Sequence, residues 1–249
     1  SLYLTYRKAS KKRLGKSARN VSFYFLMMHP FHTQRASEPG ADFPAPPSTQ
    51  AGTETLAHCL SFDRLAAWIG ARRLYEGVGH CLGEGAILVI SGANGVGKST
   101  LLRQLAGLSA IPHGGSLRWF DQHVRQAEDY DGDMIYIGDR HGLYPELRVA
   151  EQLRYLCALW GDDPARLSAA IHYMALTPYL EQRIASLSAG WKRRVTLTRL
   201  LLMPALLWLL DEPMAHLDQE GAALLGGMLH SHAERGGISI LTLPLLEKV

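Results

Sequence analysis

One short stretch constrains the fold of this chain more than any other feature. Residues 92–100 read Gly-Ala-Asn-Gly-Val-Gly-Lys-Ser-Thr, which is the spacing of a phosphate-binding loop. An apolar run from Ala86 to Ser91 precedes the loop and predicts a buried parallel strand, and the leucines from Leu101 onward predict a helix that packs on it. Such a turn lets backbone N–H groups face a phosphate at the positive end of the helix dipole. The chain is therefore expected to bind a nucleotide.

The side chains of this loop have separate expected roles. Lys98 adds a point charge toward the β- and γ-phosphates, and the Ser99 hydroxyl is placed to hold Mg²⁺. The loop alone does not distinguish kinases, GTPases and transport ATPases. The nucleotide-binding residues that the motif predicts are Gly92, Asn94, Gly95, Val96, Gly97, Lys98, Ser99 and Thr100.

A second apolar run ends in two acids. Residues 206–213 read Leu-Leu-Trp-Leu-Leu-Asp-Glu-Pro, which predicts a buried strand that delivers Asp211 and Glu212 to the carboxyl edge of an open α/β sheet. Asp211 is a candidate metal ligand, and Glu212 is a candidate catalytic residue that polarises a water. On its own this pattern is weak, because many strands end in acidic turn residues.

The segment Leu187-Ser188-Ala189-Gly190 makes the combination specific. Ser188 lies 23 residues before Asp211 and is a good helix N-cap, and a free helix start is an anion site. With these three motifs in order, the chain resembles the ABC ATPases. The resemblance implies an α/β fold, in which a P-loop parallel sheet core carries an antiparallel β edge subdomain and an inserted α-helical subdomain. It also implies that Ser188 and Gly190 meet the γ-phosphate bound by the other protomer of an ATP-sandwich homodimer.

The same resemblance gives roles to three further positions. Trp68 stands 30 residues before Lys98, where the family places an aromatic that stacks on adenine; the alternative is a core aromatic of the edge sheet. Asp218 matches the family's cross-dimer residue, although an ordinary turn Asp explains it almost as well. Arg140 follows the predicted strand Met134 to Ile137, where the family carries a Gln that touches the metal and the attacking water.

Softer matches narrow the resemblance to one group within the family. Residues 136–138, 142–155, 187–194, 208–213 and 236–238 are similar to the ATP-binding subunits of haem exporters in cytochrome c maturation, and the similarity runs from about Thr55 onward. It implies that ATP binding and hydrolysis, with Mg²⁺, are coupled to an integral membrane subunit at the cytoplasmic face of the inner membrane. An ABC ATPase for another exported substrate and a non-hydrolysing, nucleotide-gated assembly module are the alternatives.

An α-helical insertion is predicted at about residues 140–190. The family docks this lobe on its membrane subunit, so residues 143–147 are the candidate coupling surface. Asp163-Pro164 is expected to begin a second helix of the lobe. The apolar face of the first helix consists of Val149, Leu153, Leu156 and Trp160.

Departures from the family pattern bear on turnover. Arg140 replaces the activating Gln, and Trp191 follows the signature Gly190 where the family has Gln. The chain reads Thr242-Leu243-Pro244 where the family has Thr-His, and no His follows His232. ATP binding should survive these losses because its contacts lie elsewhere. Hydrolysis is expected to be slow, because the attacking water is less well positioned.

The positive charge is concentrated in the first residues. Residues 1–53 hold 8 Lys and Arg against 2 Asp and Glu, a net +6, so the remainder of a chain with net charge +3 carries −3. The body is therefore not a polybasic nucleic-acid binder. We interpret residues 1–53 as a basic, disordered leader and linker and residues 54–249 as the ABC ATPase domain. Alternatively the leader is a transit peptide, which would place the protein at an organelle's matrix face, or an anionic-lipid contact.

Cysteine and histidine spacing predicts no metal site. Cys59, Cys81 and Cys157 lack metal-ligand spacing and fit a reducing compartment. His230 and His232 lie two apart on a predicted helix and so point to different faces, and we expect both to be exposed to solvent.

Overall fold

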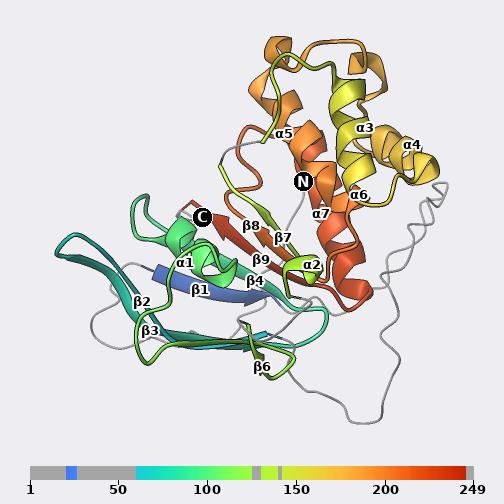
Figure 1. The fold of residues 1–249 in the computed structure, drawn as a ribbon. Helices are drawn as coiled ribbons and strands as arrows, with labels where there is room; N and C mark the ends of the chain where they lie inside the picture. Colours follow the sequence, from blue (N-terminus) through green and yellow to red (C-terminus); the bar gives the residue numbers. More distant parts are fainter. Residues whose placement is uncertain (1–20, 27–59, 125–129, 140–141, 245–249) are drawn as a thin grey trace, which may run out of the picture.

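The structure is a computed structural model that describes residues 21–26, 60–124, 130–139 and 142–244. Two sheets and a group of helices make up the described part of the chain (Figure 1). One sheet has the order β1(Val21–Leu26), β4(Ile87–Gly92), β9(Ile238–Leu243), β8(Leu207–Leu210), β7(Met134–Ile137). The other has the order β3(Arg72–Leu82), β2(Leu60–Ile69), β5(Ser116–Trp119), β6(Gln122–His123). This arrangement confirms the predicted P-loop core with an antiparallel edge sheet.

The parallel strands are buried on both faces, which explains their continuous apolar runs. Leu88 and Ile90 belong to the core shared with α1(Lys98–Leu105) and the four-stranded sheet. Their neighbours Ile87 and Val89 belong to the core shared with the helices on the opposite face. Figure 1 accordingly draws the five-stranded sheet between the helical lobe and the antiparallel sheet.

The position of β9 decides the layout of the carboxyl edge. β9 lies between β4 and β8 and pairs in parallel with both, with Ile90 opposite Thr242 and Leu210 opposite Leu241. The phosphate loop after β4 and the acids after β8 are therefore separated by one strand. Thr242, next to the end of that strand, lies between them.

The helices between β7 and β8 form the predicted lobe (Figure 1). The Asp163 carboxylate accepts hydrogen bonds from the N–H groups of Ala165 and Arg166, at 3.0 and 3.1 Å, and so caps the second helix as expected. Trp160 is 38% exposed because the first helix ends one residue earlier, so its assignment to the apolar face is wrong. The helices are α3(Val149–Leu159), α4(Pro164–Tyr173), η1(Thr177–Tyr179), η2(Ile184–Ser186), α5(Ala189–Leu197) and α6(Arg199–Leu202); α2(Tyr130–Asp133) and α7(Gln219–Glu234) flank them in sequence.

Strand β1 departs from the interpretation of residues 1–53 as a disordered leader. It pairs antiparallel with β4, from Val21 opposite Gly92 to Leu26 opposite Ile87. Its sequence, VSFYFL, is rich in β-branched and aromatic residues, which favour strands, and β4 offers an unpaired edge without it. That signal was available in the sequence. The other residues before Leu60, Cys59 among them, lie outside the described residues, and the domain boundary at residue 53 stays a prediction.

The described ranges contain neither a candidate membrane span nor a candidate metal cluster. No helix there is long and apolar enough to cross a membrane. Nor do three His, Cys, Asp or Glu side chains in those ranges come together as a metal site. Cys81 is exposed and Cys157 is buried, and both are free thiols.

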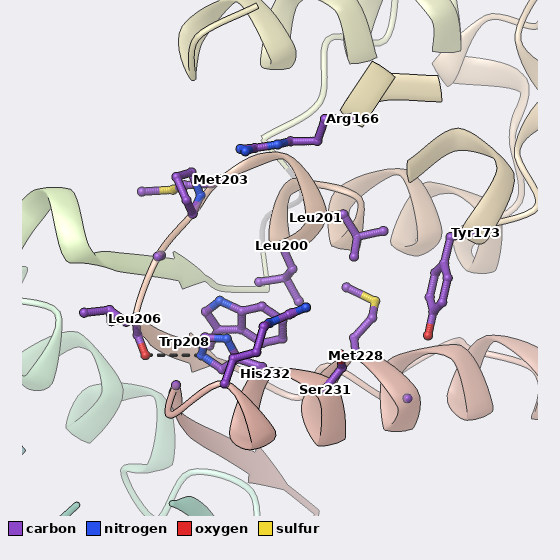
Figure 2. A pocket seen from close by; sticks show the side chains of 15 residues that line it. Arg166, Tyr173, Leu200, Leu201, Met203, Leu206, Trp208, Met228, Ser231 and His232 are labelled. Atoms are coloured by element: carbon purple, nitrogen blue, oxygen red, sulfur yellow. Dashed lines mark hydrogen bonds between the residues drawn. The ribbon is translucent and has the colours of Figure 1, made fainter. Parts of the chain in front are cut away.

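His232 is buried, contrary to the expected exposure. Its ring stacks on Trp208 at the start of β8, with centroids 3.8 Å apart and an interplanar angle of 8°, and Nε2 lies 3.2 Å from the Leu206 carbonyl oxygen. A cavity of about 260 Å³ adjoins this stack between α4, α6 and α7 (Figure 2). A Cβ at Gly237 would lie 2.2 Å from the imidazole, so the stack requires glycine there. His230, on another face of α7, is partly exposed and lies 3.1 Å from Glu234.

The buried imidazole predicts a pH-dependent stability. Burial lowers the pKa of His232 to about 4, below the value of about 6.5 expected in the unfolded chain. Because the folded pKa is the lower one, His232 contributes stability that is present above pH 6.5 and is lost as the pH falls toward 4. Between pH 7.5 and 4.5 we expect this residue to account for roughly 2–3 kcal/mol of the lost unfolding free energy.

Urea unfolding at pH 7.5 and 4.5 would measure this loss of unfolding free energy. His232→Phe should lose less unfolding free energy on acidification than the wild type, while the control His230→Phe should behave as the wild type does. Equal acid sensitivity in His232→Phe would contradict the assignment.

Candidate nucleotide site

The phosphate loop has a backbone that two of its glycines permit. Gly95 and Gly97 have φ angles of 74° and 103°, in the region that side chains disfavour. Gly97 also lies against Tyr75 of β3, where an added Cβ would be 2.9 Å from the ring. The loop therefore follows a tight course and delivers Lys98 as the first residue of α1.

Lys98 joins the loop to the end of β8. Its side chain is buried, and Nζ donates hydrogen bonds to the carbonyl oxygens of Gly92 at 2.8 Å and Ala93 at 3.3 Å. The same Nζ lies 3.6 Å from Glu212 Oε1. No acidic residue occupies the first turn of α1. A cation at a helix start with no competing carboxylate in that turn suits the phosphate groups of a nucleotide.

Asp211 and Thr242 form a buried polar pair at the same edge. Thr242 Oγ1 donates to Asp211 Oδ1 at 2.6 Å and accepts from the Glu212 N–H at 2.8 Å. In the described part of the chain, no ion pair joins the 4% exposed Asp211 to a Lys, Arg or His side chain. A buried carboxylate and the Ser99 hydroxyl in the first turn of α1 supply the hard oxygen ligands that Mg²⁺ prefers. These residues therefore fit the metal.

Glu212 has a strained backbone that several contacts hold. Its φ angle is 43°, which non-glycine residues rarely adopt and which persists only where the surroundings impose it. Thr242 binds its N–H, and its carbonyl oxygen accepts from the Ala215 N–H at 3.0 Å. Its side chain is 41% exposed beside Lys98. The backbone is thus fixed while the carboxylate stays open to solvent, as the role of polarising a water requires.

Arg193 of α5 also holds this turn. Its guanidinium, 2% exposed, donates to the carbonyl oxygens of Asp211 at 2.8 Å, Glu212 at 2.9 Å, Gly138 at 3.2 Å and Pro213 at 3.3 Å. Burial lowers the pKa of Arg193, against the attraction of the nearby carboxylates. The side chain therefore binds backbone groups after both β7 and β8.

The signature residues lie beside the loop that follows Glu212. Ser188 caps α5, as predicted, by accepting the Trp191 N–H at 3.4 Å. A Cβ at Gly190 would lie 2.7 Å from the His216 carbonyl oxygen, so this close approach requires glycine. Among the described residues, no hydrogen bond joins Ser188 or Gly190 to the phosphate loop of the same chain. One chain thus brings together Lys98, Asp211 and Glu212 but not the signature.

The residues after the signature connect it to Asp218. Arg194, 1% exposed, donates to Asp218 at 2.8 Å and to Glu220 at 2.7 Å. Burial acts to lower the pKa of Arg194, but these two hydrogen bonds outweigh it and the pKa is raised, while the bond from Arg194 lowers the pKa of Asp218. Asp218 also caps α7, accepting the Gly221 N–H at 2.8 Å, so the capping role is real and the cross-dimer role stays a prediction. The Arg194 guanidinium lies over the Trp191 ring, with Cζ 4.6 Å from the ring centroid.

Trp68 lies near the tip of the β2–β3 hairpin. It is 48% exposed, so the alternative of a core aromatic does not fit, and its stacking on adenine stays a prediction. Tyr75 donates to Gln104 at 2.8 Å, and Gln104 donates to the Ala66 carbonyl oxygen at 2.9 Å. These bonds fix the hairpin on α1, next to the phosphate loop.

Two contributors to the site were missed from the sequence, and one prediction lies outside the described residues. Thr242 could have been identified, because a polar residue near the carboxyl end of an apolar strand is a candidate site residue. Nothing in the sequence identified Arg193, because a basic residue on a helix is more often exposed to solvent. Arg140 is not among the described residues.

Comparison with known proteins agrees with this geometry. A family model described as ABC transporter matches residues 75–215. Three curated relatives share one name, cytochrome c biogenesis ATP-binding export protein CcmA. The protein of Albidiferax ferrireducens is 36% identical over 186 residues, 74% of this chain and 88% of that protein. That of Methylococcus capsulatus is 42% identical, covering 70% and 84%, and that of Alkalilimnicola ehrlichii is 43% identical, covering 68% and 72%.

Solved structures give the same fold. An ATP-binding subunit of an ABC transporter is 27% identical, with a TM-score of 0.62 over 74% of this chain and 79% of that one. An ATP-binding cassette of an ABC transporter in an ADP conformation is 18% identical, with a TM-score of 0.61, and shows the fold alone. The chain therefore belongs to the ABC transporter ATP-binding proteins and, within them, to the family of the cytochrome c biogenesis ATP-binding export protein CcmA.

Proposed function

We propose that this chain is the ATP-binding subunit of an export complex that acts in cytochrome c biogenesis and resembles a haem exporter. The observation that carries the proposal is the juxtaposition of Lys98, Asp211 and Glu212 at one sheet edge, in a chain 36–43% identical to CcmA proteins. Lys98 and the loop amides bind the phosphates, Ser99 and Asp211 hold Mg²⁺, and Glu212 polarises the attacking water. Trp68 stacks on the adenine.

The nucleotide-binding site is completed by a second copy of the chain. Ser188 and Gly190 lie at the start of a helix and are not bonded to the phosphate loop of their own chain. A helix start of this kind suits a phosphate supplied by another protomer. We therefore expect two protomers to enclose two Mg·ATP between them.

An exposed aromatic surface on the helical lobe supports the proposal that an integral membrane subunit docks there. Tyr144 and Tyr155 are 50% and 45% exposed and pack edge to face with centroids 5.8 Å apart, and Leu159 is 53% exposed. The segment that carries Tyr144 is bonded to the residues before the signature, because the Ala185 N–H donates to the Pro145 carbonyl oxygen at 3.0 Å. A displacement of this segment by an integral membrane subunit would therefore be transmitted to the signature residues. We place the protein peripherally on the cytoplasmic face of the inner membrane, or on an organelle's matrix face if the leader is a transit peptide.

Co-purification with its membrane subunit would test the assignment. A Tyr155→Glu and Leu159→Glu double variant should lose that subunit and keep ATP binding, while Glu181→Gln, an exposed change elsewhere on the lobe, should keep both. Retention of the subunit by the double variant would contradict this docking surface.

Removal of the loop cation should weaken nucleotide binding. Lys98→Ala loses charge-assisted contacts to phosphate, so the affinity for ATP should fall about ten- to a hundredfold, with more than one lost contact adding to this. Titration with a fluorescent ATP analogue measures the change, and Lys192→Ala is a matched control on another helix. Unchanged affinity in Lys98→Ala would refute the role of this loop.

The hydroxyl of Thr242 should matter for the metal. Thr242→Val removes the bonds to Asp211 and to the Glu212 N–H at nearly constant volume, and losses of this kind typically weaken metal sites about ten- to a hundredfold. The measurement is the Mg²⁺ concentration that half-saturates ATP binding. Thr242→Ser keeps the hydroxyl and should behave as the wild type does, and an identical Mg²⁺ dependence in all three proteins would remove Thr242 from the site.

Dimerisation should depend on both ATP and the signature. The wild type should be monomeric without nucleotide and should pair with ATP and Mg²⁺ on size-exclusion chromatography. Ser188→Arg should stay monomeric and still bind ATP, because a bulky cation blocks the helix start. Ser186→Arg, an exposed change two residues earlier, is the control. A dimer that ignores nucleotide or tolerates Ser188→Arg would argue against the sandwich.

A second candidate function is a nucleotide-gated assembly module that closes on ATP without hydrolysing it. It is favoured by Leu243, which ends β9, and by Pro244, which follows it, at the position where the family resembled carries a His. Loss of one positioning group commonly costs about 100-fold in rate. We expect turnover well below the usual range of about 1 to 10³ s⁻¹, with little further slowing by Glu212→Gln. Phosphate release from the subunit with its membrane partner decides between enzyme and switch, and fast turnover that Glu212→Gln abolishes would refute the second candidate.

A further inference from the structure

We propose that Arg193 is a positioning residue that joins the signature helix to the catalytic turn of the same chain. The signature helix is α5 with its cap Ser188, and the catalytic turn is residues 211–216. The positioning of the turn rests on the single chain. The further consequence, that a phosphate bound at Ser188 and Gly190 fixes Glu212, rests on the proposed function.

The contacts of Arg193 are with backbone, not with charge. All three guanidinium nitrogens donate to carbonyl oxygens, at 2.8 to 3.3 Å, and none of these bonds goes to a carboxylate. One acceptor, Gly138, directly follows β7, and the other acceptors follow β8. The planar fork of an arginine can serve several fixed acceptors at once, which a lysine ammonium does less well. Arg193 therefore sets the orientation of peptide groups at the ends of two neighbouring strands.

The shape of the catalytic turn explains why a cation is needed there. Three consecutive carbonyl oxygens, those of Asp211, Glu212 and Pro213, converge on one guanidinium. Such a convergence is electrostatically unfavourable unless a donor stands at its centre. It also coincides with the left-handed backbone of Glu212, φ 43°. Arg193 is thus one of the contacts that impose this conformation.

A second contact binds the same helix to the same turn. Gly190 approaches the His216 carbonyl oxygen so closely that an added Cβ would lie 2.7 Å from it. Gly190 and Arg193 are three residues apart and so lie on one face of α5. The helix therefore contacts the turn near both of its ends, through Arg193 at Glu212 and through Gly190 at His216. A displacement of the helix start that did not also move the turn would break one contact or the other.

This arrangement makes the signature helix and the catalytic turn one rigid unit. The start of that unit faces a phosphate in the proposed dimer, and its other end holds Glu212 beside Lys98 of the same chain. Occupation of one nucleotide site therefore orders the glutamate of the other. Nucleotide affinity at the phosphate loop is separate, because Arg193 donates none of its hydrogen bonds to that loop.

Amide hydrogen exchange, read by peptide, tests both steps without requiring turnover. In the nucleotide-free protein, Arg193→Met should speed exchange in a peptide covering residues 211–217 about ten- to a hundredfold, since charged hydrogen bonds are lost. Arg193→Lys should give an intermediate rate. Lys192→Met removes a cation from the adjacent position, whose Nζ donates to the Ala185 carbonyl oxygen and not to the turn among the described residues, and it should leave the turn unchanged. Peptides from β4 and α7 report whether the fold is intact, and if the Met variant does not fold, the Lys variant decides.

The dimer is tested by adding Mg²⁺ and a non-hydrolysable ATP analogue. In the wild type, peptides 187–192 and 211–217 should both become protected, while in Arg193→Met only the signature peptide should. Wild-type exchange in the turn of nucleotide-free Arg193→Met would overturn the positioning role, and nucleotide-induced protection of the turn in that variant would overturn the coupling. If the wild type shows no protection, the proposed sandwich fails, whereas the nucleotide-free comparison still decides the role of Arg193.

Discussion

The backbone of Glu212 is the constraint on which the candidate site depends. A left-handed glutamate after a buried strand is unfavourable by itself, and it is held by bonds from different parts of the chain. Thr242 of β9 binds its N–H, and Arg193 of α5 binds its carbonyl oxygen. Lys98 of α1 lies beside its carboxylate. The site therefore exists only when the sheet, the phosphate loop and the helical lobe are assembled together.

The order of strands makes this convergence possible. With β9 between β4 and β8, the phosphate loop and the acids are one strand apart. The end of β9 supplies Thr242, which holds one oxygen of Asp211 and leaves the rest of that carboxylate for a cation. Alternate side chains of these strands pack into the two cores, so a slip in register would disturb the close packing of both. The rigidity of the site is thus a property of both cores.

The sequence predicts the parts of the site that are local and misses those that depend on packing. Spacing within one segment is enough for the phosphate loop, for the acids after β8 and for the caps Ser188 and Asp163, because each is formed by neighbours along the chain. Arg193 could not be identified in this way, since its acceptors lie 18 to 55 residues away.

Other errors have the same physical origin. His232 is two residues from His230 and does point to a different face, but only the packing of α7 on Trp208 decides that this face is buried. Strand β1 is an exception, because its four β-branched or aromatic residues were a local signal that the basic, proline-rich surroundings outweighed.

The residue after β9 is tied to the strand that precedes the phosphate loop. Ser91 of β4 donates to the Pro244 carbonyl oxygen at 2.9 Å, so the chain that leaves β9 is bonded back to the strand that precedes the phosphate loop. The chain at this point consists of the apolar Leu243 and a proline whose carbonyl oxygen is bonded to β4. Neither side chain can hydrogen-bond a water or a phosphate. In the proposed site the water is positioned by Glu212, whose backbone Thr242 and Arg193 hold. On that proposal, the stability of these backbone contacts decides whether the site hydrolyses ATP or only binds it.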